Sequence, residues 1–299
     1  MLSRRRLLPP AIAVAVLAIV GTVLWLANRS SPVPTAIPHT APAVGSCWSV
    51  DDKAITGLLP FPGHSIACSA PHTAEIVSVG QVDQKLVRNA QHAAGQDAQV
   101  NSFIMTTSAR ATCIDKAGSY VGGAWRGAQL SVYPDFIQPA KDGFFACVVA
   151  QIADPAGTRL VTRSASLVAA LSGADSTALS IDCVGAAGTE GTDGAALTFV
   201  DCGKPHTSEF MGLYTITPAN APYNGPAIKR AVTTGCQQMM DSFVGLTAGQ
   251  SRSDLRVSEV GPDTANLWAG SDQTFACYVS GSAPWIGSVK GLGTRPLPH

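Results

Sequence analysis

The sequence is poor in charge, and this already disfavours some classes of function. Only 13% of its 299 residues are charged, whereas 46% are hydrophobic, and the formal net charge is zero. A typical soluble domain has about 25% charged residues, so this composition is unusual for a cytosolic protein. A protein that binds nucleic acid needs a basic face, and no part of the sequence predicts one.

Sequence motifs that carry known chemistry are also missing. No Gly-x-Ser-x-Gly nucleophile motif occurs, and no glycine loop of the phosphate-binding kind precedes a helix. No Cys-x-x-Cys-His haem motif is present, and no two cysteines are separated by only two to four residues, as structural zinc sites usually require. We therefore expect no cofactor, no bound metal and no enzymatic activity.

The N-terminal segment is a long apolar stretch. Leu7–Ala27 is broken only by two prolines, a glycine and a threonine, and its 21 residues match the thickness of a bilayer core. Three arginines at 4–6 precede it and only Arg29 follows closely, so we expect the N-terminus to stay in the cytoplasm. The segment predicts a cytoplasmic stub at residues 1–6 and a single transmembrane helix at 7–28.

Two export signals are alternative interpretations of this segment. A cleaved signal peptide needs a small-x-small site just after the apolar core, and Trp25-Leu-Ala27 fits that requirement poorly. Ser3–Leu8 also resembles a twin-arginine signal, although its arginines serve equally well as determinants of topology.

The rest of the chain carries one motif twice. Cys-x-x-Pro-His-Thr-x-Glu occurs at residues 68–75 and again at 202–209. Further matches follow in the same order, with Tyr-Val-Gly-Gly seven residues after Cys113 and Phe-Val-Gly-Leu seven residues after Cys236. A repeat of this length indicates two domains rather than a solenoid.

The domain organisation follows from this repeat. Four prolines within residues 29–43 predict an extended stalk. A first module is expected at residues 44–171 and a second at 178–292, and each is long enough to bury its own core. Segments rich in β-branched residues surround one helical segment in each module. The predicted class is therefore α+β, with a small antiparallel sheet and a helical layer in each module.

The elements can be placed approximately within the modules. In the second module we expect strands near residues 180–184, 197–202 and 209–216. A helix should then begin near Asn224-Gly-Pro226. In the first module we expect a strand at 75–80, a helix within 84–120, and strands at 129–133 and 144–150.

The eight cysteines form two matched sets of four, which outside the cytoplasm predicts disulfides. Each set allows three pairings, and the sequence alone does not choose between them. We favour a first bond that ties adjacent strands and a second bond that pins the helix to the last strand. These bonds are Cys47–Cys68, Cys113–Cys147, Cys183–Cys202 and Cys236–Cys277.

Together these features resemble the actinobacterial septum-formation domain family, in two tandem copies. The resemblance rests on Gly45-Ser-Cys47, on the two repeated motifs with the Cys113 and Cys236 that follow them, and on Trp268-Ala-Gly-Ser-Asp272 before Cys277. It covers both modules and implies a single-pass envelope protein that acts in septum formation. No established catalytic activity comes with it, so it implies a location and a process rather than a mechanism.

The repeated motif contains the only ionisable pair that both modules share. Its residues are Pro71, His72 and Glu75, and again Pro205, His206 and Glu209. A histidine and a glutamate three residues apart could form a metal or acid–base site if they lay on one helical turn. Proline before the histidine instead predicts a turn entering a strand, where residues three apart point to opposite faces. A metal would also need a further ligand. We therefore expect structural histidines that bond to the backbone.

The remaining candidates for chemistry are single residues. Ser166 and Ser288 are expected to be strand residues rather than nucleophiles. Four tryptophans could line a groove for a glycan or a peptide, although core packing is their more common use; they are Trp48, Trp125, Trp268 and Trp285.

The sequence thus predicts a non-enzymatic, single-pass protein of the cell membrane with its bulk outside the cytoplasm. Its expected partner is an envelope protein or a cell-wall component near the division site. One alternative is an envelope hydrolase or metal-binding protein that uses the repeated His-x-x-Glu pair. The other is an extracytoplasmic sensor or scaffold unrelated to division, which would need a partner to signal because the cytoplasmic stub is so short.

Overall fold

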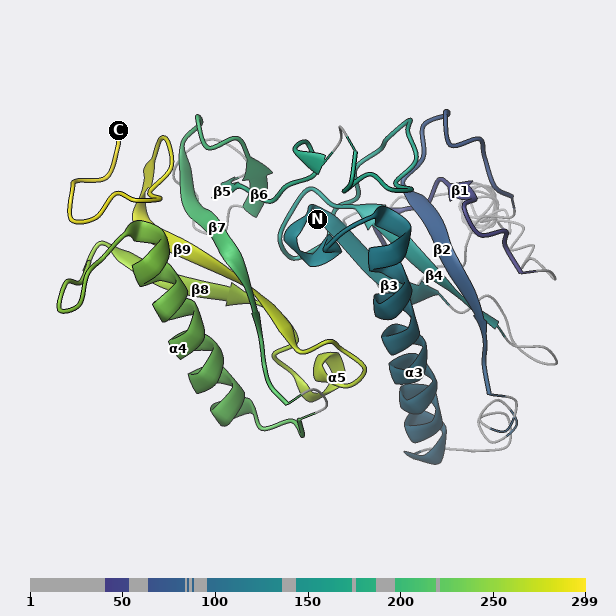
Figure 1. Cartoon of the computed structure of the whole chain (residues 1–299). Coiled ribbons are helices and arrows are strands. Elements are labelled where there is room, and N and C mark those ends of the chain that lie inside the picture. Colours follow the sequence, from purple (N-terminus) through teal and green to yellow (C-terminus); the bar gives the residue numbers. More distant parts are fainter. Residues whose placement is uncertain are drawn as a thin grey trace, which may run out of the picture. The chain divides into compact units, whose positions relative to one another are not determined.

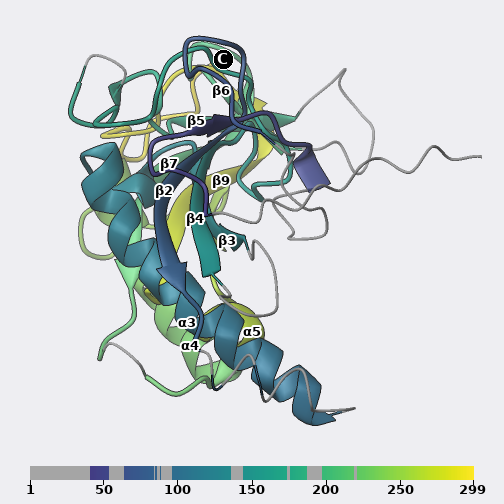
Figure 2. The same ribbon diagram turned by 90° about the vertical axis from the view of Figure 1, so that its right-hand side faces the viewer.

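Two antiparallel sheets, each covered on one face by a long helix, make up the described part of the computed structural model (Figures 1 and 2). The structure describes residues 41–53, 64–83, 85, 88, 96–135, 144–173, 176–186, 197–218 and 221–299. The α+β class and the antiparallel sheets predicted from the sequence are confirmed.

The N-terminal half, residues 41–173, contains a four-stranded sheet. Its strand order is β1-β2-β4-β3, and every neighbouring pair is antiparallel. The strands are β1 (Cys47–Trp48), β2 (Ala74–Gln81), β3 (Leu130–Asp135) and β4 (Phe144–Gln151). Helix α3 (Gln96–Val121) contributes Ala109, Cys113, Ala117 and Val121 to the core beneath it, and the short helix η2 (Trp125–Gly127) follows.

The C-terminal half, residues 176–299, repeats this order and adds one edge strand. Its five strands lie in the order β6-β5-β7-β9-β8, again with antiparallel neighbours. They are β5 (Cys183–Ala186), β6 (Leu197–Val200), β7 (His206–Thr215), β8 (Leu255–Val260) and β9 (Thr274–Trp285). Helix α4 (Gly225–Val244) covers the sheet. In the sequence, the short helix α5 (Ala265–Trp268) comes between β8 and β9.

Helix α4 begins where its sequence predicts. The Asn224 side chain caps it by accepting from the Ala227 N–H, and a proline stands in its first turn. Gly245 ends it in the left-handed conformation, with φ of 81°. Buried residues recur every four positions along the face toward the sheet, at Ile228, Val232, Cys236, Met240 and Val244.

The registers of the two sheets agree around the repeated glutamate. In each half the glutamate pairs with a disulfide cysteine on one side and a valine on the other; the triplets are Cys47–Glu75–Val149 and Cys183–Glu209–Val279. Each central strand also has an irregularity one residue further on, between Ile76 and Ser78 or between Phe210 and Gly212. The two glutamates therefore occupy equivalent places.

The four disulfides join the pairs that we favoured from the sequence. Cys113–Cys147 joins α3 to β4, and Cys236–Cys277 joins α4 to β9, as expected. The other two bonds differ in detail, because Cys68 and Cys202 lie in turns rather than in strands. The bonded cysteines are 19 to 41 residues apart, so each bond is worth roughly 3–4 kcal/mol in the chain-entropy description.

The predicted membrane segment cannot be compared with this fold. The stub at residues 1–6, the transmembrane helix at 7–28 and the stalk up to residue 40 lie outside the described residues. Among the residues that are described, no helix combines the length and the hydropathy that a bilayer crossing requires.

Candidate functional site

The histidine of the first motif stands just before a central strand. β2 begins at Ala74, and His72 lies two residues before it, beyond a bend at Thr73, in an isolated bridge where its backbone exchanges hydrogen bonds with that of Arg163. Its imidazole points toward Glu75, and Nε2 of His72 lies 3.2 Å from Oε1 of Glu75. The expectation that these two side chains point to opposite faces is wrong, because the alternation of a strand does not yet apply at His72.

Glu75 is fully buried, and donors from two distant parts of the chain surround it. The Leu167 N–H donates to Oε1 at 2.6 Å. The hydroxyls of Ser166 and Tyr120 donate to Oε2 at 2.8 and 3.0 Å. A buried carboxylate without such donors would be strongly destabilising. Glu75 therefore ties the start of β2 to the end of α3 and to the segment after β4.

The hydrogen bonds of His72 fix where its protons lie. Nδ1 is 2.9 Å from the Ala70 carbonyl oxygen, which can only accept, so Nδ1 carries a proton. The contact between Nε2 and Glu75 then needs a second proton between them. Because three other donors already point at the carboxylate, the geometry favours an imidazolium next to a charged glutamate. The two side chains thus share a proton inside the core, and each is held by further hydrogen bonds.

Tyr120 contributes to this network as a donor. Burial, and secondarily the charge of Glu75, raise the pKa of Tyr120 well above its ordinary value. The hydroxyl therefore stays protonated and keeps its hydrogen bond to the carboxylate throughout the physiological range of pH.

The second motif keeps the glutamate but leaves the histidine less completely bonded. Glu209 accepts from the Ser288 hydroxyl and from the Val289 N–H, the latter at 2.8 Å. His206 Nδ1 donates to the Lys204 carbonyl oxygen at 2.7 Å, but Nε2 has no hydrogen-bond partner among the described residues. The imidazole instead lies edge-on to the Trp285 ring, with 4.8 Å between centroids.

One substitution removes a donor from the second network. Tyr120 and Phe243 occupy the same position, because the backbone carbonyl of each accepts from the turn after the last strand, from Ala169 and Gly291 respectively. Phenylalanine lacks the hydroxyl that reaches Glu75 in the first half. The two halves thus share a scaffold but differ in how fully its polar groups are satisfied.

The two serines were not recognised from the sequence as partners of the glutamates. The expectation that Ser166 and Ser288 are strand residues is wrong, because both lie in irregular segments. Each hydroxyl accepts a hydrogen bond from the N–H two residues later, at Val168 or Lys290, and donates a hydrogen bond to the glutamate. The sequence feature that the two sites share is a serine followed by an aliphatic residue. This pair is too common to identify a partner of the glutamate.

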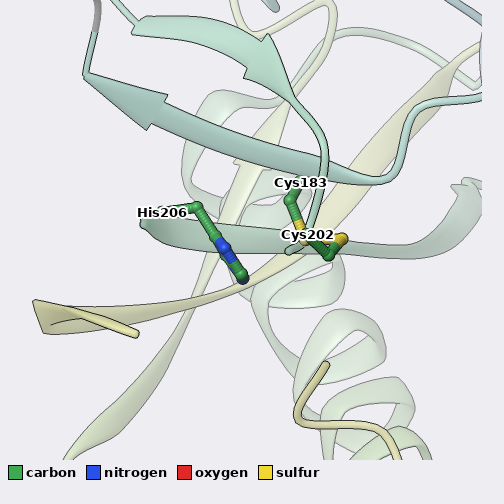
Figure 3. A group of neighbouring side chains, drawn as sticks. All are labelled: Cys183, Cys202 and His206. Atoms are coloured by element: carbon green, nitrogen blue, oxygen red, sulfur yellow. A yellow bond between two sulfur atoms is a disulfide. The ribbon is translucent and has the colours of Figure 1, made fainter. Parts of the chain in front are cut away.

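The repeated motif is enclosed by the fold in both halves. The two histidines and two glutamates are between 0% and 6% exposed, so a substrate cannot reach them without local opening. Ligand atoms of Cys47, His72 and Glu75 lie within 4.8 Å of one another, as do those of Cys183, Cys202 and His206 (Figure 3). All of these cysteines are in disulfides, and a metal needs the thiolate.

The four tryptophans considered as groove residues are core residues. Their exposure is 9% or less in every case, for Trp48, Trp125, Trp268 and Trp285. Trp268 donates from Nε1 to the Ala221 carbonyl oxygen, which fixes its ring within the core below α4. All four side chains are therefore almost entirely enclosed by the protein.

Comparison with known proteins gives one match. A family model described as "Septum formation" matches residues 44–277, which is more than half of the chain. No curated protein and no solved structure matches. The matched range contains both repeated motifs and all eight cysteines.

The two histidines should differ in their contribution to stability. His72→Ala leaves the buried Glu75 charge without its partner, so we expect the free energy of unfolding to fall by about 3 kcal/mol. His206→Ala loses one hydrogen bond, so we expect a fall of about 1 kcal/mol. Urea denaturation of the oxidised proteins measures both values. Equal losses would contradict the difference in bonding described above.

Tyr120→Phe should cost about 1 kcal/mol, because it removes one donor to a buried carboxylate. The folded-state pKa of Tyr120 is raised, so this contribution is complete below pH ~10 and declines as the pH rises above that value. Denaturation at pH 7 and at pH 11 should therefore show the difference between wild type and variant shrinking. The reverse change Phe243→Tyr is the matched control, and it should not destabilise the protein by this amount.

Proposed function

The chain belongs to the septum-formation family, and we propose that it acts in cell division as a non-catalytic, membrane-anchored binding protein of the cell envelope. Family membership supports the process. The observation that supports the rest is the burial of the repeated motif, whose histidines and glutamates are at most 6% exposed and bond to the surrounding chain or to each other.

The non-catalytic role is supported by the state of the ionisable pair. A general acid or base must reach the proton that it transfers, within about 3 Å or through one water. His72 and Glu75 use their polar atoms on each other and on the surrounding chain. Glu209 is held by Ser288 and Val289 in the same manner. Hydrolysis by either pair would require breaking the network that holds the strands.

We infer that the two halves are tandem copies of the family's domain, at about residues 44–171 and 178–292. The strand order, the cysteine pairing and the register around the glutamate are the same in both halves. Two copies on one stalk would present two related surfaces to the envelope, which suits a protein that joins partners.

Anchoring is the interpretation that best fits the N-terminal sequence and the cysteines together. Residues 7–28 are apolar enough to span a bilayer, and the arginines before them favour a cytoplasmic N-terminus. Four disulfides need an oxidising compartment, which lies on the other side of that membrane.

The exposed side chains favour a protein partner over a glycan. Among the described residues, three large apolar side chains lie within one turn and a half of α3 and are 41–49% exposed: Val100, Phe103 and Ile104. Spacing of three and four residues places them on one face of the helix, as in helices that dock into a groove of another protein. The tryptophans that could have stacked on sugars are buried.

Septal localisation tests this proposal. A fluorescent fusion of the full chain, expressed in its native host, should concentrate at division septa. The double change Phe103→Ser and Ile104→Ser should disperse it along the envelope, because the apolar contact is lost while folding is little affected. Val168→Ser is the control, since Val168 is 54% exposed and lies in the segment after β4, outside the apolar face formed by Val100, Phe103 and Ile104. Uniform distribution of the wild-type fusion would refute the role in septation.

The anchor has a separate test. A C-terminal alkaline phosphatase fusion should be active, and the mature protein should keep its N-terminal residues in the membrane fraction. Mass spectrometry of the intact N-terminus decides between the anchor and a cleaved signal. A soluble form that begins soon after Ala27 would show that the segment is removed.

A further inference from the structure

The second half contains a buried histidine next to a disulfide, and one nitrogen of this histidine has no hydrogen-bond partner among the described residues. His206 is 1% exposed, and its Nε2 makes no hydrogen bond among the described residues. Leaving a polar atom buried and unpaired costs about 1–3 kcal/mol. In the first half the same atom of His72 is used by Glu75. The second half thus has an imidazole nitrogen that is available as a metal ligand, whereas the equivalent nitrogen of the first half is not available.

Two sulfur atoms lie beside this imidazole (Figure 3). Ligand atoms of Cys183, Cys202 and His206 are all within 4.8 Å of one another. Zinc binds cysteine sulfur at about 2.3 Å and histidine nitrogen at about 2.0–2.1 Å in tetrahedral geometry, which places neighbouring ligand atoms about 3.5–4 Å apart. Once the sulfur–sulfur bond is open, side-chain rotation is enough to reach this spacing.

We propose that reduction of the Cys183–Cys202 disulfide creates a metal site, with two thiolates and the His206 imidazole as ligands for a soft divalent ion such as Zn²⁺. This site goes beyond the proposed role in division. A dithiol supplies two electrons and two protons to the sulfurs, and it leaves as its own cyclic disulfide. The metal ion then binds as both cysteine thiols lose their protons, so that two protons are released.

The histidine is already oriented as a metal ligand. Its Nδ1–H donates to the Lys204 carbonyl oxygen at 2.7 Å, so the lone pair of the neutral ring lies on Nε2. Metal-binding histidines in proteins are usually held in this way, with the second nitrogen donating to a carbonyl or a carboxylate. Three protein ligands leave a fourth position for water.

Access to the disulfide is also in place. Cys183 is buried, but Cys202 is partly exposed in its turn, so a thiolate can attack that sulfur. The disulfides between helix and strand, Cys113–Cys147 and Cys236–Cys277, are fully buried. Mild reduction should therefore open the turn disulfides and leave each helix joined to its sheet.

The first half supplies a matched control within the same chain. Its disulfide Cys47–Cys68 also has one partly exposed sulfur and should open under the same conditions. There, however, Nε2 of the neighbouring His72 is bonded to Glu75 and is not free for a metal. The proposal therefore predicts zinc binding at one of the two related positions only.

The experiment uses the full chain, purified in detergent, reduced mildly with a dithiol and then passed into dithiol-free buffer with or without Zn²⁺. Alkylation by N-ethylmaleimide, read by mass spectrometry of peptides, reports each cysteine. We expect Zn²⁺ to protect Cys183 and Cys202 by at least about tenfold in rate while Cys47 and Cys68 react as before. Equal protection of both pairs, or protection of neither, would overturn the proposal.

Variants identify the nitrogen ligand. His206→Ala should weaken Zn²⁺ binding at least about tenfold, because even the loss of a group that merely orients a ligand costs 10–100-fold. His72→Ala should leave the affinity unchanged. Circular dichroism of each oxidised variant checks that it is folded before reduction. Wild-type binding of one Zn²⁺ per chain that is unaltered in a folded His206→Ala variant would show that the histidine is not a ligand.

Discussion

The buried glutamate at the start of each central strand is the interaction on which the rest of both halves depends. Glu75 and Glu209 accept hydrogen bonds from a serine hydroxyl and a backbone N–H that lie 79 to 92 residues away along the chain. A carboxylate inside a core is tolerated only with such donors, so the strand and the distant turn must assemble together. The neighbouring disulfide cysteine pairs with the glutamate across the sheet and fixes the same point covalently.

The two halves show how much of this network a domain can lose and still fold. The first half satisfies its glutamate with four groups, including a tyrosine and a histidine that is itself bonded at both nitrogens. The second has lost the tyrosine hydroxyl, and its histidine keeps one bond. Serine and the backbone N–H remain in both, which indicates that these two donors are the minimum that the buried charge requires.

The fold was largely predictable, whereas the site was not. Helical periodicity and the proline at the first helical position located α4, and the repeated cysteine order indicated two equivalent sets of disulfides. The partners of Glu75 were hidden because they are far away in sequence and chemically ordinary, a serine hydroxyl and a main-chain amide. The prediction that His72 and Glu75 point to opposite faces was wrong for a local reason. It assumed that strand alternation extends to His72, but the strand begins only at Ala74.

The distribution of polar groups explains how a chain so poor in charge holds its fold. The ionisable motif that both halves share is buried, and its hydrogen bonds fix the register of each sheet. Disulfides supply stability that surface ion pairs would not. The surface is then free to vary without endangering the fold. In the second half Nε2 of His206 has no hydrogen-bond partner among the described residues, and the imidazole lies beside the sulfurs of Cys183 and Cys202. A group whose structural bond has been lost is free to acquire a ligand, whereas His72, bonded on both sides, is not.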